Sequence, residues 1–406
     1  MTSGLSPVSG KQRHVFLDAL RGFALLGICL ANYPEFSLYT FQPDDVISAM
    51  PSAETDSVVH FLLYLLVDGK FYTLFSLLFG IGFSIIISHA AERGTSGMLI
   101  FYRRMLVLMM IACCHLMLIW SGDILLLYAV LGIILTVFRS LPDRRIFWFA
   151  GCMLILPILI DTFCSCFSIF LAKYPYDQWW RYAGMYGITE ANFGTWLRDA
   201  VSYRDVFDFL KQGAWERMYE FVDGNRYFKV LGLFLIGFVI GRHKVYAHLD
   251  AHRRLLKKVA LWSVSVGMPL SVLYAWSAVS GHPWGRPMHS VLYFVSVYPL
   301  GFGYAAILAL FCACHPHLRI WKVFAAPGRM ALTNYISQSV IGFLLFYGVG
   351  FGLGASMGLG ATELVAICVF CFQILFSMFW LKIFRYGPLE WIWRMLTYGR
   401  WLNPLA

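Results

Sequence analysis

The sequence predicts an all-α protein, a polytopic transmembrane helical bundle of about ten spans with both termini in the cytoplasm. Of its 406 residues, 59% are apolar and only 13% are charged, and the mean hydropathy is +0.67. Apolar runs recur from one end of the chain to the other, which is typical of multi-pass membrane proteins. Lysines and arginines gather at alternate ends of these runs, and this alternation sets the expected orientation.

The expected architecture is a single transmembrane domain over residues 15–400, between a disordered tail at 1–14 and a short tail at 401–406. Asp68-Gly69-Lys70 is expected to bend the long second span. The expected spans are 15–33, 58–89, 105–120, 124–138, 146–171, 227–241, 259–279, 288–314, 331–353 and 363–384.

One sizeable segment, residues 172–226, is expected outside the spans on the extracytoplasmic side. It is rich in tryptophan, tyrosine and charge, with an amphipathic pattern near its end. Helices lying on the outer leaflet explain this composition, and contact with an external or lipid-borne substrate is the alternative.

The net charge of +10 does not predict a nucleic-acid partner, because the basic residues stand at span ends where membrane topology accounts for them. The expected partner is the lipid bilayer. The ten cysteines fall almost entirely within apolar runs. We interpret them as buried packing residues and predict no metal site, since no histidine or aspartate accompanies them at ligand spacing.

The strongest candidate site is the helical hairpin over residues 105–132. Two apolar arms flank the turn Ser121-Gly122-Asp123, and each arm is shorter than a full membrane crossing. Asp123 should therefore lie in a recess, since a carboxylate at membrane depth requires a partner or water. His115 and Tyr128 stand at similar distances on either side of the turn and should face each other, beside Trp120.

This hairpin suggests a catalytic role for three residues. His115 would act as the general base, Asp123 would fix its tautomer, and Tyr128 would polarise a carbonyl. A structural histidine, hydrogen-bonded to a neighbour, explains the same pattern without chemistry.

Other charged residues inside the spans are candidates for binding substrate. Asp18 and Arg21 are three residues apart, on one helical face, and can pair with each other. Asp68 and Lys70 are two apart and point to different faces, so each requires another partner. Asp123 is the partner expected for Lys70.

Near the C-terminus, Asn334 and Gln338 share one face of the ninth span, where hydrogen bonds between helices or ligand binding would explain them. Arg329, Arg385 and Arg394 flank this region at the cytoplasmic side. They either anchor the chain at the membrane surface or bind phosphate.

Several motifs spread over nearly the whole chain resemble the YeiB-like family of bacterial inner-membrane proteins. The motifs are Leu17-Asp18-x-x-Arg21-Gly22 with Asn32, Lys70-Phe71 before Leu77-Leu78-Phe79-Gly80, His115 with Gly122-Asp123-Ile124-Leu125, Gly328-Arg329-Met330-x-Leu332-Thr333-Asn334-Tyr335, and Gly387-Pro388-Leu389-Glu390-x-x-Trp393-Arg394. The resemblance implies a location in the bacterial inner membrane.

That family is in turn distantly similar to transmembrane acyltransferases such as the lysosomal heparan-glucosaminide N-acetyltransferase. The similarity rests on the Asp18-x-x-Arg21-Gly22 and Asn32 pattern. It implies transfer of an acyl group from cytoplasmic acyl-CoA to a sugar on the other side of the membrane. The catalytic histidine of those enzymes follows the asparagine closely, whereas here no histidine lies between Asn32 and His60.

We therefore expect a membrane acyltransferase that modifies an envelope glycan or a lipid-linked acceptor. His115 would replace the missing histidine, Asn32 or Tyr128 would polarise the thioester, and Arg21, Arg329 and Arg385 would bind the phosphates of CoA. The alternative is a transporter or flippase of an amphipathic anion, in which the same charges line a path. A homodimer is left open.

Overall fold

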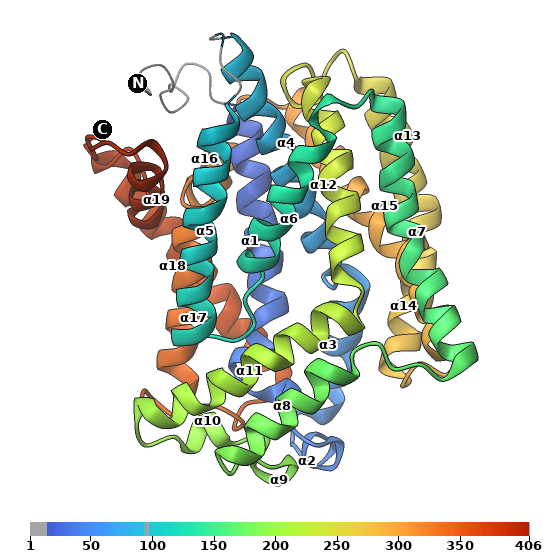
Figure 1. Ribbon diagram of the computed structural model, residues 1–406, viewed down its shortest axis with the longest axis vertical. Helices are drawn as coiled ribbons and strands as arrows, with labels where there is room; N and C mark the ends of the chain where they lie inside the picture. The colour runs from blue at the N-terminus through green and yellow to red at the C-terminus, as the bar shows by residue number, and fades with distance from the viewer. Residues whose placement is uncertain (1–13, 93, 95–96, 406) are drawn as a thin grey trace.

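The computed structural model describes residues 14–92, 94 and 97–405, and within these residues the fold is all-helical (Figure 1). The helices are α1 (Val15–Phe36), α2 (Asp44–Ser48), α3 (Ala53–Leu66), α4 (Lys70–Glu92), α5 (Met98–Leu118), α6 (Leu125–Leu135), α7 (Asp143–Phe167), α8 (Lys173–Met185), α9 (Glu190–Phe193), α10 (Trp196–Asp199), α11 (Tyr203–Asp223), α12 (Arg226–Arg242), α13 (Arg253–Trp262), α14 (Met268–Val279), α15 (Gly285–Cys314), α16 (Arg319–Arg329), α17 (Ala331–Phe346), α18 (Leu359–Ile383) and α19 (Pro388–Tyr398).

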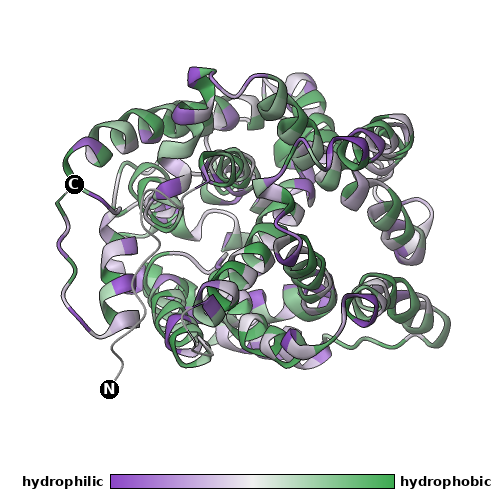
Figure 2. Ribbon diagram, turned by 90° about the horizontal axis from the view of Figure 1, so that it is seen from above, coloured by the Kyte–Doolittle hydropathy of each residue, from purple (hydrophilic) through white to green (hydrophobic). Residues whose placement is uncertain are grey.

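The bundle has two distinct ends. The first turn of α1 and helix α19 lie toward one end, which we call the terminal end, and α8 to α11 cover the other, which we call the loop end (Figure 1). Viewed along the bundle, the long helices are coloured mostly as hydrophobic (Figure 2). Outward-facing apolar side chains on such helices are suited to lipid.

Within the described residues, seven helical segments are long and apolar enough to cross a membrane, or eight if the bent pair α11–α12 is one span. This confirms a multi-pass, all-α membrane protein. Two further apolar helices, over residues 125–140 and 331–346, are shorter. The ten crossings and the cytoplasmic termini stay predictions. The predicted tail at 1–14 lies almost wholly outside the described residues.

The long second span is broken where the sequence predicted a bend. Helix α3 ends at Leu66 and α4 begins at Lys70. Gly69 between them has a φ of +70°, a conformation that glycine adopts without steric cost. A backbone break at membrane depth occurs where it is buried in protein or lines a cavity.

Close approach of helix backbones depends on glycine at the α4–α12 contact. A Cβ atom on Gly80 would lie 2.1 Å from the carbonyl oxygen of Phe234, and one on Gly237 would lie 2.2 Å from that of Leu77. Small residues at such positions let membrane helices pack tightly in the absence of a hydrophobic driving force.

Replacing Gly80 with alanine is therefore expected to destabilise the protein by about 1–3 kcal/mol, the usual cost of overpacking. Thermal unfolding in a mild detergent measures this change. A Cβ atom on Gly151 would have no other atom within 4 Å, so Gly151→Ala is the matched control. Equal melting temperatures for the two variants would contradict this packing account.

Candidate functional site

A cavity of about 940 Å³ runs through the bundle beside α1. Its wall includes Asp18 near the start of α1 and Glu35 near the end of that helix. A helix rises about 1.5 Å per residue, so the cavity follows α1 for about 25 Å. Its wall carries residues from α19 at the terminal end and from α11 at the loop end.

Basic side chains dominate the wall at the terminal end. The wall there includes the candidates Arg21 and Arg329 together with Arg104 and Arg394. Arg21 forms an ion pair with Asp18 at 2.7 Å, as the sequence predicted. The guanidinium carbon of Arg104 lies 3.8 Å from the ring centroid of Trp393 in α19. This end therefore has an excess of positive charge around an aromatic surface.

Glu390 fixes the start of α17 at the same end. Its carboxylate accepts hydrogen bonds from the backbone of Leu332 at 2.7 Å and from the hydroxyl of Thr333 at 2.6 Å. Burial raises the pKa of the Glu390 carboxyl, and the hydrogen bonds from Thr333 oppose that rise. Arg385 is exposed and does not line the cavity, but its carbonyl accepts a hydrogen bond from Arg329 at 3.3 Å.

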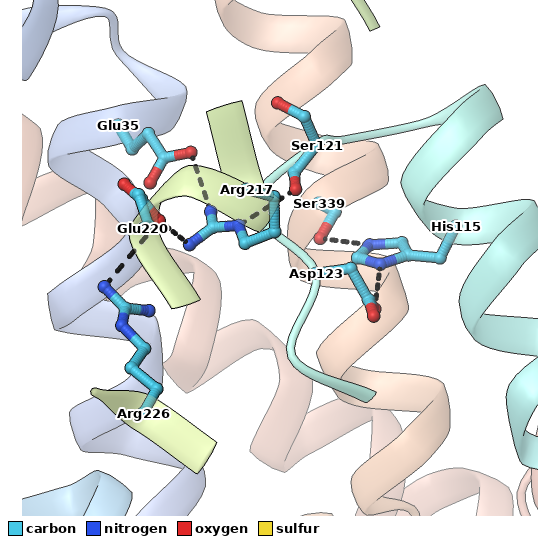
Figure 3. Close-up of polar contacts among 8 residues, drawn as sticks. All are labelled: Glu35, His115, Ser121, Asp123, Arg217, Glu220, Arg226 and Ser339. Carbon is cyan, nitrogen blue, oxygen red and sulfur yellow. Dashed lines mark hydrogen bonds and ion pairs between the residues drawn. The ribbon is translucent and has the colours of Figure 1, made fainter. Parts of the chain in front are cut away.

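At the loop end, Arg217 of α11 enters the bundle with only 8% of its surface exposed. It donates to the carbonyl of Ser121 at 3.0 Å, forms an ion pair with Glu220, and lies 3.4 Å from a carboxylate oxygen of Glu35 (Figure 3). Glu220 is also 3.7 Å from Arg226. Two arginines and two glutamates thus form one network that joins α1, α11 and α12.

Gly122 in the hairpin turn allows close contact with this network. A Cβ atom on Gly122 would lie 1.9 Å from the indole of Trp120 and 2.5 Å from the Arg217 guanidinium. Trp120 is buried, lines the cavity and lies beside Glu35. Glycine at this position therefore lets the turn, the indole and the guanidinium pack against one another.

His115 and Asp123 are in contact, as predicted. Nδ1 of His115 lies 2.8 Å from Oδ2 of Asp123, and Nε2 lies 2.9 Å from the hydroxyl oxygen of Ser339 (Figure 3). The other Asp123 oxygen accepts a hydrogen bond from the backbone of Leu126 at 2.8 Å, at the start of α6. Because a carboxylate only accepts, the neutral ring carries its proton on Nδ1 and accepts from Ser339.

This chain of hydrogen bonds has the order of a Ser-His-Asp triad. All three residues are buried, however, because His115, Ser339 and Asp123 are each exposed by 1% or less. None of them lines the cavity. Trp120 and Tyr335 do line it, and their rings lie 6.0 and 5.3 Å from the imidazole. A ligand in the cavity would therefore meet these two rings before His115.

Two predicted contacts of the hairpin are wrong. The hydroxyl of Tyr128 is 2.7 Å from that of Ser76, so Tyr128 lines the cavity without facing His115. Lys70 is fully buried and donates to the carbonyl of Tyr64 at 2.5 Å instead of pairing with Asp123. The break between α3 and α4 directs Lys70 to this carbonyl.

The remaining candidates divide between the cavity and the helix contacts. Asn32 and Asp68 line the cavity. Asn334 donates to the hydroxyl of Ser377 at 3.0 Å and Gln338 donates to Gln373 at 2.9 Å, so both join α17 to α18 and do not line the cavity. Hydrogen bonding between helices, one of the two explanations kept for them, is what these contacts provide.

Sequence reasoning missed Glu35, Arg217, Glu220 and Arg226 as site residues. Arg217 and Glu220 are three apart on an amphipathic segment that was interpreted as a surface helix. The sequence did offer one signal of this site, because Glu35 places a carboxylate at the end of the first apolar run. Among the described residues, no group of three or more histidine, cysteine or acidic side chains is arranged to hold a metal ion.

Comparison with known proteins identifies the family. A family model described as "Protein of unknown function (DUF418)" matches residues 240–400. An uncharacterized 39.9 kDa protein of Bacillus acidopullulyticus is 30% identical over 98% of this chain and 97% of its own length. The chain belongs to the YeiB-like, or DUF418, family.

Two other members of the family match over nearly their full lengths. The uncharacterized protein YxaH of Bacillus subtilis is 28% identical over 100% of this chain and 98% of its own. The uncharacterized protein YeiB of Escherichia coli is 28% identical over 95% and 96%, respectively. No solved structure matches. The predicted family is confirmed, whereas the similarity to acyltransferases stays a prediction.

Replacing His115 with alanine is expected to destabilise the protein, because Asp123 and Ser339 would lose their partner. Each buried polar group left without a hydrogen bond costs about 1–3 kcal/mol. The thermal unfolding midpoint in detergent measures the effect. His317 is exposed, so His317→Ala is the control, and a wild-type midpoint for His115→Ala would contradict a structural contribution from the cluster.

Proposed function

We propose that this protein is a membrane-embedded acyltransferase of the bacterial inner membrane, with its terminal end in the cytoplasm. It would take an acyl group from acyl-CoA and deliver it to an envelope glycan or lipid-linked acceptor. The observation that carries the proposal is the cavity along α1, which has arginines at one end and a network of arginines and glutamates around the buried Arg217 toward the other.

The terminal end suits the phosphates of CoA. Arg21, Arg104, Arg329 and Arg394 all line the wall there, and guanidinium groups are effective phosphate ligands because they donate in a planar fork. Trp393 offers an adjacent aromatic face. The acyl thioester of a donor bound in this way would extend along α1 toward Asn32 and Glu35.

Asn32 and Glu35 are placed to act on the thioester. They are three residues apart on α1 and both line the cavity. Among the described residues, none forms a hydrogen bond with the Asn32 side chain, so its amide can donate to the carbonyl oxygen of a bound donor. Arg217 lies 3.4 Å from a carboxylate oxygen of Glu35, and a carboxylate in the cavity wall can accept a proton from an acceptor hydroxyl.

The proposed step transfers one acyl group. Glu35 removes the proton from an acceptor hydroxyl, whose oxygen attacks the thioester carbon. The carbon–sulfur bond breaks, and the proton passes from Glu35 to the CoA thiolate. The sequence suggested His115 as the base, but the rings of Trp120 and Tyr335 lie between His115 and a ligand in the cavity. We therefore assign the general base to Glu35 and a positioning role to His115.

A second candidate function is transport of an amphipathic anion. It is favoured by the extent of the cavity toward both ends and by the position of His115 off its wall. Transport requires charged and polar groups along a path but forms no covalent bond. The two functions differ in their need for acyl-CoA.

Incubation of the purified protein with radiolabelled acetyl-CoA and a panel of envelope glycans tests the proposal. Glu35→Gln is expected to lower label transfer by about 10²–10⁴-fold, the usual contribution of a general base, while acetyl-CoA binding is retained. Glu54 is exposed in the first turn of α3, so Glu54→Gln is the matched control. Full activity of Glu35→Gln with loss in a folded His115→Ala would transfer the base role to His115.

Proteoliposomes test the rival function. Acyl transfer predicts that no acyl-CoA or acceptor crosses the vesicle membrane intact, and that radiolabel appears across it only on the acceptor. Flux of an unmodified anion that is independent of acyl-CoA, together with no transfer across the glycan panel, would replace the acyltransferase by a transporter.

A further inference from the structure

A second group of side chains lines the cavity at the break between α3 and α4. Four tyrosines form this surface, which we call the tyrosine wall: Tyr64, Tyr72, Tyr274 and Tyr293. The wall is closely packed, because the ring centroid of Tyr274 is 5.9 Å from those of Tyr64 and Tyr293. A Cβ atom on Gly69 would lie 2.6 Å from the Tyr293 hydroxyl.

Lys229 of α12 also lines the cavity at this wall. Its ammonium group lies 4.1 Å from the ring centroid of Tyr293. Among the described residues, none accepts a hydrogen bond from this group and no carboxylate lies within ion-pair distance of it. A cation in a cavity of this depth is costly without an anionic partner, so an unpaired lysine here is a candidate ligand site.

The nearest carboxylates are already engaged. Asp68 accepts a hydrogen bond from the Tyr274 hydroxyl at 2.5 Å. Asp161 accepts from Asn225 at 3.0 Å and from Ser290, and it pairs with Arg286 at 3.2 Å. Neither carboxylate is available to take Lys229 as its main partner.

Two more polar groups, one in the tyrosine wall and one beside it, lack partners among the described residues. The hydroxyl of Tyr72 and Nδ1 of His289 are buried, and neither makes a hydrogen bond. Both residues line the cavity, and His289 and Lys229 are close enough to interact electrostatically. Buried polar groups without partners are uncommon in folded proteins, and a bound ligand is one way to satisfy them.

We infer that the tyrosine wall and Lys229 bind a phosphate group on a ligand that enters from the loop end. Lys229 supplies the charge, Tyr72 and His289 can supply hydrogen bonds, and the tyrosine rings cover the part of the ligand next to the phosphate. Arg226, one turn before Lys229, adds positive charge although it is 3.7 Å from Glu220. This inference rests on the proposed function in that it assigns the acceptor a phosphate group.

Such a phosphate has two sources, a lipid headgroup and a soluble compound. The two are separated by measuring binding to the purified full-length protein in phosphatidylcholine nanodiscs. One arm adds inorganic pyrophosphate in solution. The other includes phosphatidic acid in the nanodisc. Binding is followed by the shift in thermal unfolding midpoint at increasing probe concentration.

Lys229→Met keeps the length of the side chain and removes its charge. It is expected to weaken binding of the effective probe at least tenfold, and to raise the melting temperature without probe, because an unpaired cation is removed. Lys173→Met is the control, since Lys173 is exposed on α8 with a 3.0 Å partner in Asp177. A lysine with a purely structural role would lower the melting temperature when replaced.

Unchanged affinity of Lys229→Met, a lowered melting temperature for it, or no binding of either probe to the wild type would overturn the inference. These readouts need neither acyl-CoA nor turnover, so they are independent of the acyltransferase test. Loss of transfer in Glu35→Gln with normal probe binding in Lys229→Met would leave the proposed function standing and reject the phosphate site.

Discussion

The buried guanidinium of Arg217 is the group on which the loop end of the cavity depends. A charge at this depth requires partners, and Arg217 finds them on three separate segments: the carbonyl of Ser121 in the hairpin turn, Glu220 on its own helix and Glu35 on α1. The three partners together compensate a charge that would be costly to bury alone. The network therefore joins the helix that crosses the loop end to the helix that the cavity follows.

Hydrogen bonds of the hairpin fix the position of Trp120 beside this network. His115 is hydrogen-bonded to both Asp123 and Ser339, and these two bonds join α5, the turn and α17. Asp123 also holds the first turn of α6 through the backbone of Leu126. Trp120, between this cluster and the cavity, thereby has a fixed position beside Glu35. The buried triad lies behind the cavity wall. It orients the residues of the wall that a ligand would touch.

Much of the architecture could be predicted because it follows from hydropathy. Apolar length located the membrane-type helices, and a glycine between two charges located the break at residue 69. The contact of His115 with Asp123 followed from their closeness in the chain, with Asp123 in the turn that ends the first arm of the hairpin. The partners of Lys70 and Tyr128 could not be predicted in this way. The hydroxyl of Tyr128 meets that of Ser76, 52 residues away, which no local pattern encodes. Lys70 donates to the carbonyl of Tyr64 across the break between α3 and α4.

The site itself was harder to predict for a related reason. An amphipathic helix such as α11 has the same sequence pattern whether its polar face meets water or the interior of a bundle. Only packing over the end of α1 turns Arg217 inward. Asn334 and Gln338 show the converse. As polar residues inside a span they suggested ligand binding as readily as helix contacts, and they in fact join α17 to α18.

The claim that a cavity follows α1 through the bundle can be measured directly. In a variant without native cysteines, single cysteines would replace Ala31, which lines the cavity, and Ala24, which is fully buried and does not. Labelling by a small water-soluble thiol reagent is predicted at position 31 and not at position 24. Equal protection of both positions would contradict a hydrated cavity along this helix, and with it the account of the site.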